Sequence, residues 1–498
     1  MATDASPTLK HSMLRGGVAK LCGQGLNFAL RVAFMVTLAR LLSPRDFGLV
    51  AMATVITGIY GLFSTAGLSS ATVQKATITD EQISTLFWIN VLVGLALTAV
   101  TVVSAPAIAM FYGEPRLLPI TAALAAGFAF TGLGVQHIAL LQRSLRYFAI
   151  ASIETLSQLV STAVGIGLAF AGYGYWALIA ASLALPATMT ICAWIAVRWV
   201  PSRPCWNADI GAMLRFGGTI TVNNLVVYLG YNFEKILLGR IWGPEALGLY
   251  GRAYQLISMP TDYLNGAIGS VAFSALSRIQ EEPAKLKRYF LKGYSLTVSI
   301  TVPITVFCGL FADQIILIAL GPEWSDAAEV FRLLAPTVLV FAIINPFSWL
   351  LLSLGLQGRS LKVSLVLAPI VMGAYCVGLP FGPNGVALAY STAMVLWATP
   401  HILWCIKGTG ISFGDIAQAL RQPLLAGAVA ALGAWFLDEV LDAQLGQYGR
   451  LIIGGAAMVG LYFLFLLIIF GQKAVYIDLA KGLRGAIFGG VESKASTP

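Results

Sequence analysis

The sequence predicts an all-α polytopic membrane protein with about 14 transmembrane helices. Charged residues make up 11% and apolar residues 58% of the 498 residues, and the mean hydropathy is +0.82. Soluble domains carry roughly 25% charged residues, so this composition excludes most water-soluble architectures. A membrane-spanning helix needs ~20 apolar residues, and the chain is long enough for that number of helices with connecting loops and tails.

Apolar runs bounded by charged residues, Gly or Pro define the expected helices. Those of the first half are 17–42, 46–70, 83–106, 117–141, 150–171 and 176–197. Those of the second half are 213–239, 246–272, 290–312, 328–354, 361–380 and 384–406, and two further helices follow at 421–440 and 450–470.

The basic residues are divided unequally between the two sides of the membrane. Alternate loops place 22 Lys and Arg residues on one side and 6 on the other. Since cytoplasmic loops carry the excess of positive charge, both termini are expected in the cytoplasm. This orientation also explains the net charge of +9, because the basic residues form short loop clusters, and no nucleic-acid partner is predicted. The outer-side residues are Arg40, Arg45, Arg116, Arg240, Arg332 and Arg450.

An internal repeat divides the chain into two similar halves. Leu38–Val50 and Leu238–Tyr250 match at 5 of 13 positions, including one Arg and one Pro, and Gly172–Leu178 resembles Gly382–Leu388. Six expected helices separate the copies, so the halves share one orientation, as in parallel-repeat transporters. The alternative is chance similarity between Leu-rich and Gly-rich segments. The expected domains are an N-terminal lobe at 1–212, a C-terminal lobe at 213–410, an appended helix pair at 411–472 and a cytoplasmic amphipathic tail at 473–498.

Motifs for catalysis are missing from the sequence. It has no GxxxxGK[ST] loop for nucleotide phosphates, no HExxH zinc motif and no GxSxG nucleophile turn, and its three histidines are far apart. We therefore expect a secondary transporter rather than an enzyme, with no metal and no cofactor.

Ionisable residues inside the expected helices are the strongest functional candidates, because each is costly in hydrocarbon. Arg31 lies near the middle of the first helix, and Lys235 and Arg252 lie toward the outer ends of the seventh and eighth. If these helices face one another, the three cations would line a cavity suited to a phosphate or pyrophosphate. Alternatively, Lys235 and Arg252 extend toward the membrane surface and Arg31 pairs within the protein.

Two carboxylates are candidates for coupling transport to H+ or Na+. Asp262 follows Pro260, which interrupts the helical hydrogen bonds, and Glu234 adjoins Lys235 in sequence although adjacent helical positions point apart. Amides on the same helices suit sugar hydroxyls, although hydrogen bonding between helices is their commoner use. These amides are Asn27, Asn223 and Asn232.

Three segments resemble the polysaccharide transporter (Wzx-like) flippases of the MOP flippase superfamily: Leu38–Val50, Leu133–Arg143 and Leu238–Ala253. The resemblance extends from about Gly16 to Trp404. It implies a flippase that moves undecaprenyl-pyrophosphate-linked oligosaccharide repeat units to the outer leaflet of a bacterial inner membrane, for exopolysaccharide or lipopolysaccharide synthesis.

The resemblance also implies a V-shaped arrangement of two six-helix lobes around a central cationic cavity that opens alternately to either side. Arg31 and Arg252 match its basic residues best. The last two helices would serve the lipid tail, and polymerase or export machinery would be a partner.

Three other functions remain open at this stage. A peptidoglycan-precursor (lipid II) flippase shares the architecture, whereas a MATE-like drug or cation antiporter would be expected to have an acidic cavity. A membrane glycan polymerase would be expected to carry a large outer domain, but the longest expected loop, at 273–289, is cytoplasmic.

Overall fold

The structure is a computed structural model that describes residues 30–64, 72–73, 77–204, 211–441, 446–471 and 476. Its residues form two compact units, Met1–Gly251 and Arg252–Pro498, here called unit 1 and unit 2. The described residues contain helices and no β-strand, which confirms the predicted all-α class. The predicted amphipathic tail at 473–498 lies outside the description apart from residue 476.

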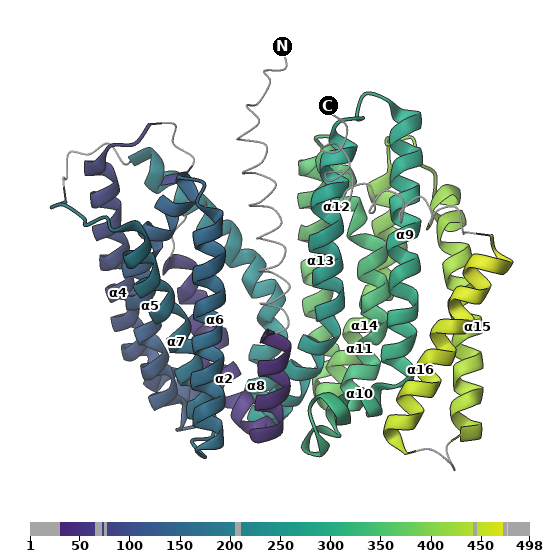
Figure 1. Cartoon of the computed structure of the whole chain (residues 1–498), viewed down its shortest axis with the longest axis horizontal. Helices are drawn as coiled ribbons and strands as arrows, with labels where there is room; N and C mark the ends of the chain where they lie inside the picture. Colours follow the sequence, from purple (N-terminus) through teal and green to yellow (C-terminus); the bar gives the residue numbers. More distant parts are fainter. Residues whose placement is uncertain are drawn as a thin grey trace, which may run out of the picture. The chain divides into compact units, whose positions relative to one another are not determined.

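The described residues of unit 1 include a helix over 30–41, the five helices α2 and α4 to α7, and the beginning of α8 (Figure 1). The expected helices at 117–141, 150–171 and 176–197 agree closely with the structure, whereas the helix expected at 83–106 extends further at both ends. The elements after residue 41 are α2 (Pro44–Ser64), α4 (Asp80–Tyr112), α5 (Leu117–Arg143), α6 (Tyr147–Phe170), α7 (Tyr175–Val197) and the beginning of α8 (Gly211–Ser277).

Glycines allow α4 and α5 to pack backbone against backbone. A Cβ atom added at Gly94 would lie 2.7 Å from the Phe128 carbonyl oxygen, and one added at Gly132 would lie 2.7 Å from that of Asn90. Contact at this distance is the packing mode that small residues permit between membrane helices.

Threonine hydroxyl groups link α4 and α7 to backbone carbonyls of α5. Thr98 Oγ1 of α4 donates to the Ala125 carbonyl of α5 at 3.0 Å, and Thr190 Oγ1 of α7 donates to Phe130 of α5 at 2.7 Å. Because hydrocarbon offers these hydroxyls no partner, each interhelical bond satisfies a group that would otherwise be costly in the membrane.

Helix α8 joins two segments that the sequence analysis placed in separate helices with a short loop between them. The interruption is one residue, Gly243, whose φ of 82° and ψ of −175° lie outside the helical region. A positive φ of this size suits glycine, which has no Cβ, and Pro244 then begins the second segment. Unit 1 contains the first segment and the second as far as Gly251. The lobe boundary expected at 212/213 stays a prediction from the repeat.

Unit 2 is a bundle built from the rest of α8 and the helices after it (Figure 1). The helix expected at 328–354 divides at Asn345, because Pro346 has no N–H and starts a new helix. The elements are α9 (Pro283–Leu310), α10 (Ala312–Ala319), η1 (Pro322–Trp324), α11 (Ala327–Ile344), α12 (Pro346–Ser353), α13 (Gln357–Gly378), η2 (Leu379–Phe381), α14 (Gly382–Ile406), α15 (Phe413–Leu441), α16 (Gln447–Phe463) and η3 (Leu464–Ile469).

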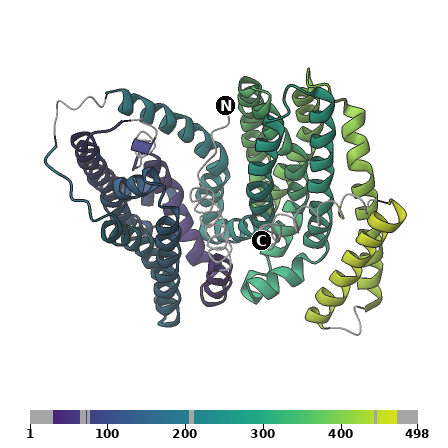
Figure 2. The same cartoon turned by 45° about the horizontal axis from the view of Figure 1, so that its top comes forward.

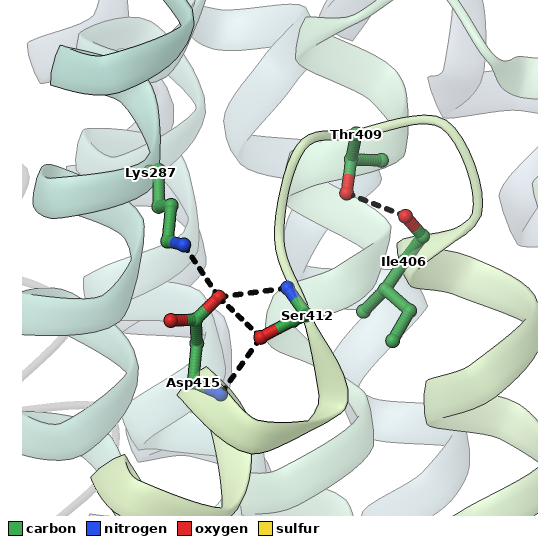
Figure 3. A network of polar contacts seen from close by, with 5 residues as sticks. All are labelled: Lys287, Ile406, Thr409, Ser412 and Asp415. Atoms are coloured by element: carbon green, nitrogen blue, oxygen red, sulfur yellow. Dashed lines mark hydrogen bonds and ion pairs between the residues drawn. The ribbon is translucent and has the colours of Figure 1, made fainter.

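The appended pair α15 and α16 lies at one side of unit 2, as the last part of the chain in Figure 2 shows, and packs against α9. The buried Tyr462 hydroxyl of α16 donates to the Ser299 carbonyl of α9 at 2.7 Å. At the start of α15, Lys287 Nζ of α9 lies 2.6 Å from Asp415 Oδ2, which also accepts from the Ser412 backbone N–H and hydroxyl (Figure 3). The ion pair between Lys287 and Asp415 therefore links α15 to α9.

Ten helices or helix pairs in the described residues are long and apolar enough to cross a membrane. One of them, Gln357–Ile406, contains both α13 and α14, and another, Ala327–Ser353, contains α11 and α12. The chain is therefore a multi-pass membrane protein by length and composition. The expected number of about 14 helices stays a prediction.

We predict that Gly132→Leu destabilises unit 1, because the new side chain must displace the α4 backbone at Asn90. Overpacking of this kind lowers the melting temperature by roughly 2–10 °C. The control is Gly167→Leu at an exposed position of α6, where an added Cβ has no atom within 4 Å. Thermal unfolding of the two variants in detergent measures the difference, and equal melting temperatures would contradict the close packing.

Candidate functional site

One face of α2 packs along the first segment of α8 in unit 1. The Tyr228 hydroxyl of α8 donates to the Val55 carbonyl of α2 at 3.0 Å. A Cβ atom added at Gly58, less than one turn further along α2, would lie 2.1 Å from the same hydroxyl oxygen. Gly58 therefore leaves space for the Tyr228 side chain. Tyr228 is the first of three hydrogen-bonded polar residues on α8.

Three residues spaced four and three apart on α8 are joined by hydrogen bonds, and we call Tyr228, Asn232 and Lys235 the α8 polar ladder. Asn232 Nδ2 donates to the Tyr228 carbonyl at 2.9 Å, and Lys235 Nζ donates to Asn232 Oδ1 at 2.8 Å. All three are half-buried. Asn232 is a neutral partner, and an ammonium has three donors with which to bind an anion.

Glu234 is the most buried charged residue of this region. It is 1% exposed, and its Oε2 atom has no hydrogen-bond partner among the described residues. It adjoins Lys235 but lies on another face of the helix, and the lysine donates to Asn232. A buried carboxylate without full hydrogen bonding is costly when ionised.

The two predicted arginines occupy different surroundings. Arg31 is exposed on the helix over 30–41. This helix packs on α6 through Phe34, whose ring would lie 2.7 Å from a Cβ atom added at Gly165. Arg252 begins unit 2 and is half-buried, and its Nη1 atom donates to Gln255 Oε1 on the next turn of α8. This hydrogen bond within α8 orients the Arg252 side chain.

The remaining predicted residues have no described side chains. Asn27 lies outside the described residues, and Asn223 and Asp262 lie in α8 at positions whose side chains are not described. The structure thus joins two predicted residues, Asn232 and Lys235, directly. Tyr228 lies within the helix expected at 213–239, and its spacing of four residues from Asn232 is the sequence signal for this contact.

No group of three or more His, Cys, Asp or Glu side chains suited to a metal ion occurs among the residues that the structure describes. The chemistry that the described groups offer is the binding of an anion by lysine and arginine, hydrogen bonding to neutral hydroxyls, and uptake of a proton by a carboxylate.

Comparison with known proteins gives consistent results over most of the chain. A model of the family described as "Polysaccharide biosynthesis protein" matches residues 37–329. The lipopolysaccharide biosynthesis protein WzxC of Escherichia coli is 25% identical over 455 residues, which are 88% of this chain and 90% of that protein. The succinoglycan biosynthesis transport protein ExoT of Rhizobium meliloti is 22% identical over 461 residues, or 91% and 93%.

A solved structure supports the fold. The lipid II flippase MurJ in an inward closed conformation superposes with a TM-score of 0.72 at 13% identity, covering 93% of this chain and 100% of that one. At this identity the likeness shows the fold alone, and it confirms the fold that the resemblance to the MOP superfamily implied.

We predict that Tyr228→Phe destabilises the protein modestly, because the hydroxyl that links α8 to α2 is lost. One neutral hydrogen bond contributes about 1 kcal/mol, which corresponds to a melting temperature lower by roughly 2–4 °C. The control is Tyr173→Phe, since the Tyr173 ring is exposed. Thermal unfolding of the purified variants measures both shifts, and a Tyr228→Phe protein as stable as the control would show that the bond contributes nothing.

Proposed function

The chain belongs to the polysaccharide biosynthesis protein family, and we propose that it is a flippase that moves lipid-linked oligosaccharides across a bacterial inner membrane. Its substrate is an undecaprenyl-pyrophosphate-linked repeat unit for exopolysaccharide or lipopolysaccharide synthesis. The observation that carries the proposal is the family match over more than half of the chain. Full-length similarity to proteins named for polysaccharide biosynthesis and transport supports it.

The physical need for such a protein follows from the substrate. A pyrophosphate and several sugars would lose their hydration in ~30 Å of hydrocarbon, at a cost of many kcal/mol. Arg31, Lys235 and Arg252 replace water around the pyrophosphate, and Asn232, with Asn27 and Asn223, binds sugar hydroxyls. The polyprenyl tail stays in lipid while the site opens alternately to either side.

Coupling to an ion gradient is the second part of the proposal. Glu234 is buried and its Oε2 atom has no hydrogen-bond partner in the described part of unit 1, so uptake of H+ would remove an unfavourable buried charge. Asp262 is the other carboxylate proposed for H+ or Na+ coupling. Protonation changes the charge next to Lys235, which gives the anion site two states with different affinities.

One alternative function is that of a flippase for a peptidoglycan precursor, which is compatible with the fold shared with the lipid II flippase MurJ. Both substrates would carry a phosphate-linked sugar on a polyprenyl tail, so the basic residues suit either. The two functions differ in which lipid-linked glycan stays on the inner leaflet when the protein is missing.

We predict that deletion of the gene causes lipid-linked polysaccharide repeat units to accumulate on the cytoplasmic leaflet. Extraction of polyprenyl-linked glycans and mass spectrometry identify the product, and complementation by the full chain should clear it. Accumulation of the peptidoglycan precursor instead would establish the alternative, whereas accumulation of neither would contradict both flippase functions.

We predict that Arg31→Ala leaves the protein in the membrane but lowers polymer export by on the order of 100-fold, because the pyrophosphate loses a charged partner. Arg31→Lys should retain part of the export, since it keeps the charge but not the paired hydrogen bonds. Arg203→Ala, at an exposed residue of the segment 201–204, is the control. Exported polymer per unit of membrane protein is measured, and full export by Arg31→Ala would remove this residue from the mechanism.

A further inference from the structure

Two turns at one end of unit 1 hold ordinary residues in a backbone conformation that favours glycine. Leu145, between α5 and α6, has a φ of 55°, and Arg198, at the end of α7, has a φ of 52°. They are the non-glycine residues with positive φ in the part of the chain that the structure describes. A Cβ atom makes this conformation costly, so both positions would ordinarily favour glycine.

The first of these turns has a counterpart in unit 2 that uses glycine. The repeat relates Gly172 to Gly382, a spacing of 210 residues that also pairs Leu145 with Gly355. The two turns share three backbone hydrogen bonds, donated by residues 144 to 146 in one turn and by residues 354 to 356 in the other, to carbonyls at matching positions. Gly355 has a φ of 72°. Unit 1 therefore has a leucine where the same turn favours glycine.

Packing within unit 1 does not offset the backbone cost of this leucine. Leu145 is 69% exposed, and Phe148 and Val200 are 70% and 75% exposed. Arg198 is also exposed, and the residue 210 positions after it is Gly408, whose φ is 72°. Both costly residues thus direct their side chains away from the rest of unit 1.

Hydrogen bonds hold the two turns together at this end of the unit. Arg146 Nη1 donates to the Ala196 carbonyl at 3.1 Å, which joins the turn between α5 and α6 to the end of α7. Trp88 Nε1 of α4 donates to the Ser202 carbonyl at 2.8 Å, so the chain on the far side of Val200 is also held. We use the name turn surface for five exposed residues of this end: Leu145, Arg146, Phe148, Arg198 and Val200.

The turn surface combines two guanidinium groups with three apolar side chains. In the predicted orientation this end of unit 1 faces the cytoplasm, and the cytoplasmic leaflet carries anionic lipids. Guanidinium groups bind phosphate through paired hydrogen bonds, and apolar side chains at the membrane boundary contact acyl chains. An anionic phospholipid offers both kinds of partner, whereas a soluble anion offers the charge alone.

We propose that the turn surface binds an anionic phospholipid of the cytoplasmic leaflet, with the phosphate at Arg146 and Arg198. Its acyl chains contact Leu145, Phe148 and Val200. Contact with the lipid then offsets the backbone cost of the leucine and of the arginine after α7. The site uses none of the residues assigned to the transported substrate, so it goes beyond the proposed function. The alternative occupant is the surface of another protein.

Added lipid should stabilise the folded protein, because a ligand that binds only the folded state raises the melting temperature. The full-length chain is unfolded in detergent with phosphatidylglycerol or with phosphatidylcholine of the same acyl chains. Phosphatidylglycerol should raise the melting temperature by about 3 °C more than phosphatidylcholine does. Arg198→Gln should lose at least half of this difference, whereas Lys407→Gln, at an exposed residue of unit 2, should keep it. Equal effects of the two lipids on the native chain would overturn the proposal and favour a protein partner.

Glycine at position 145 separates lipid binding from a structural role. Leu145→Gly suits the positive φ, so without lipid the variant should melt no lower than the native chain. It should nevertheless gain less from phosphatidylglycerol, and so should Phe148→Ala. The control is Phe381→Ala, whose ring is 75% exposed in unit 2, and it should gain as much as the native chain. An undiminished gain in Leu145→Gly and Phe148→Ala would show that the turn surface does not hold the lipid.

Native mass spectrometry counts bound lipids without depending on stability. After purification with phosphatidylglycerol, the native chain should retain at least one more lipid than the double variant Arg198→Gln/Phe148→Ala. The matched double variant Lys407→Gln/Phe381→Ala should retain as many lipids as the native chain. Equal retention by all three proteins would overturn the proposal. None of these measurements uses polymer export, so they test the lipid site separately from the proposed function.

Discussion

Every polar group that this chain carries into the bilayer must find a partner within the protein, because hydrocarbon supplies none. The structure meets this constraint with short contacts between helices. Thr98 and Thr190 donate to carbonyls of α5, and Tyr228 donates to a carbonyl of α2. Several buried side chains, among them Thr121, Glu234 and Tyr294, have an oxygen atom without a hydrogen-bond partner among the described residues, and of these three only Glu234 can carry a negative charge near neutral pH. The same constraint applies to the proposed substrate, whose pyrophosphate must exchange water for protein cations before it enters the membrane.

Much of the fold was predictable because apolar helices are bounded by residues with strong local preferences. The helices α5 to α7 begin and end close to the expected residues, and the all-α class followed from composition alone. The connection within α8 was not predictable in this way, because a single positive φ at Gly243 replaces the expected loop. Pro346 lies inside the helix expected at 328–354, but the expected boundaries did not include the new helix that starts there.

The site was predictable in its residue types and less so in its contacts. Lys235 and Asn232 were both candidates, but their hydrogen bond depends on helix geometry that residue types alone do not specify. The repeat showed that proline and glycine recur, although it gave no sign that Gly48 and Gly248 meet the prolines of the opposite copies. Contacts between segments 200 residues apart depend on tertiary packing. A repeat in one sequence therefore predicted similar halves but not the surface through which its copies touch.

We propose that this protein alone moves an anionic lipid-linked glycan between leaflets. The most direct measurement reconstitutes the purified full-length chain in sealed vesicles that carry a polyprenyl-pyrophosphate-linked oligosaccharide labelled on its sugar. With a proton or sodium gradient imposed, we expect labelled headgroups initially on one leaflet to become accessible to an impermeant glycosidase added on the other side. Accessibility no greater than in protein-free vesicles, with correctly folded protein in the membrane, would contradict the account.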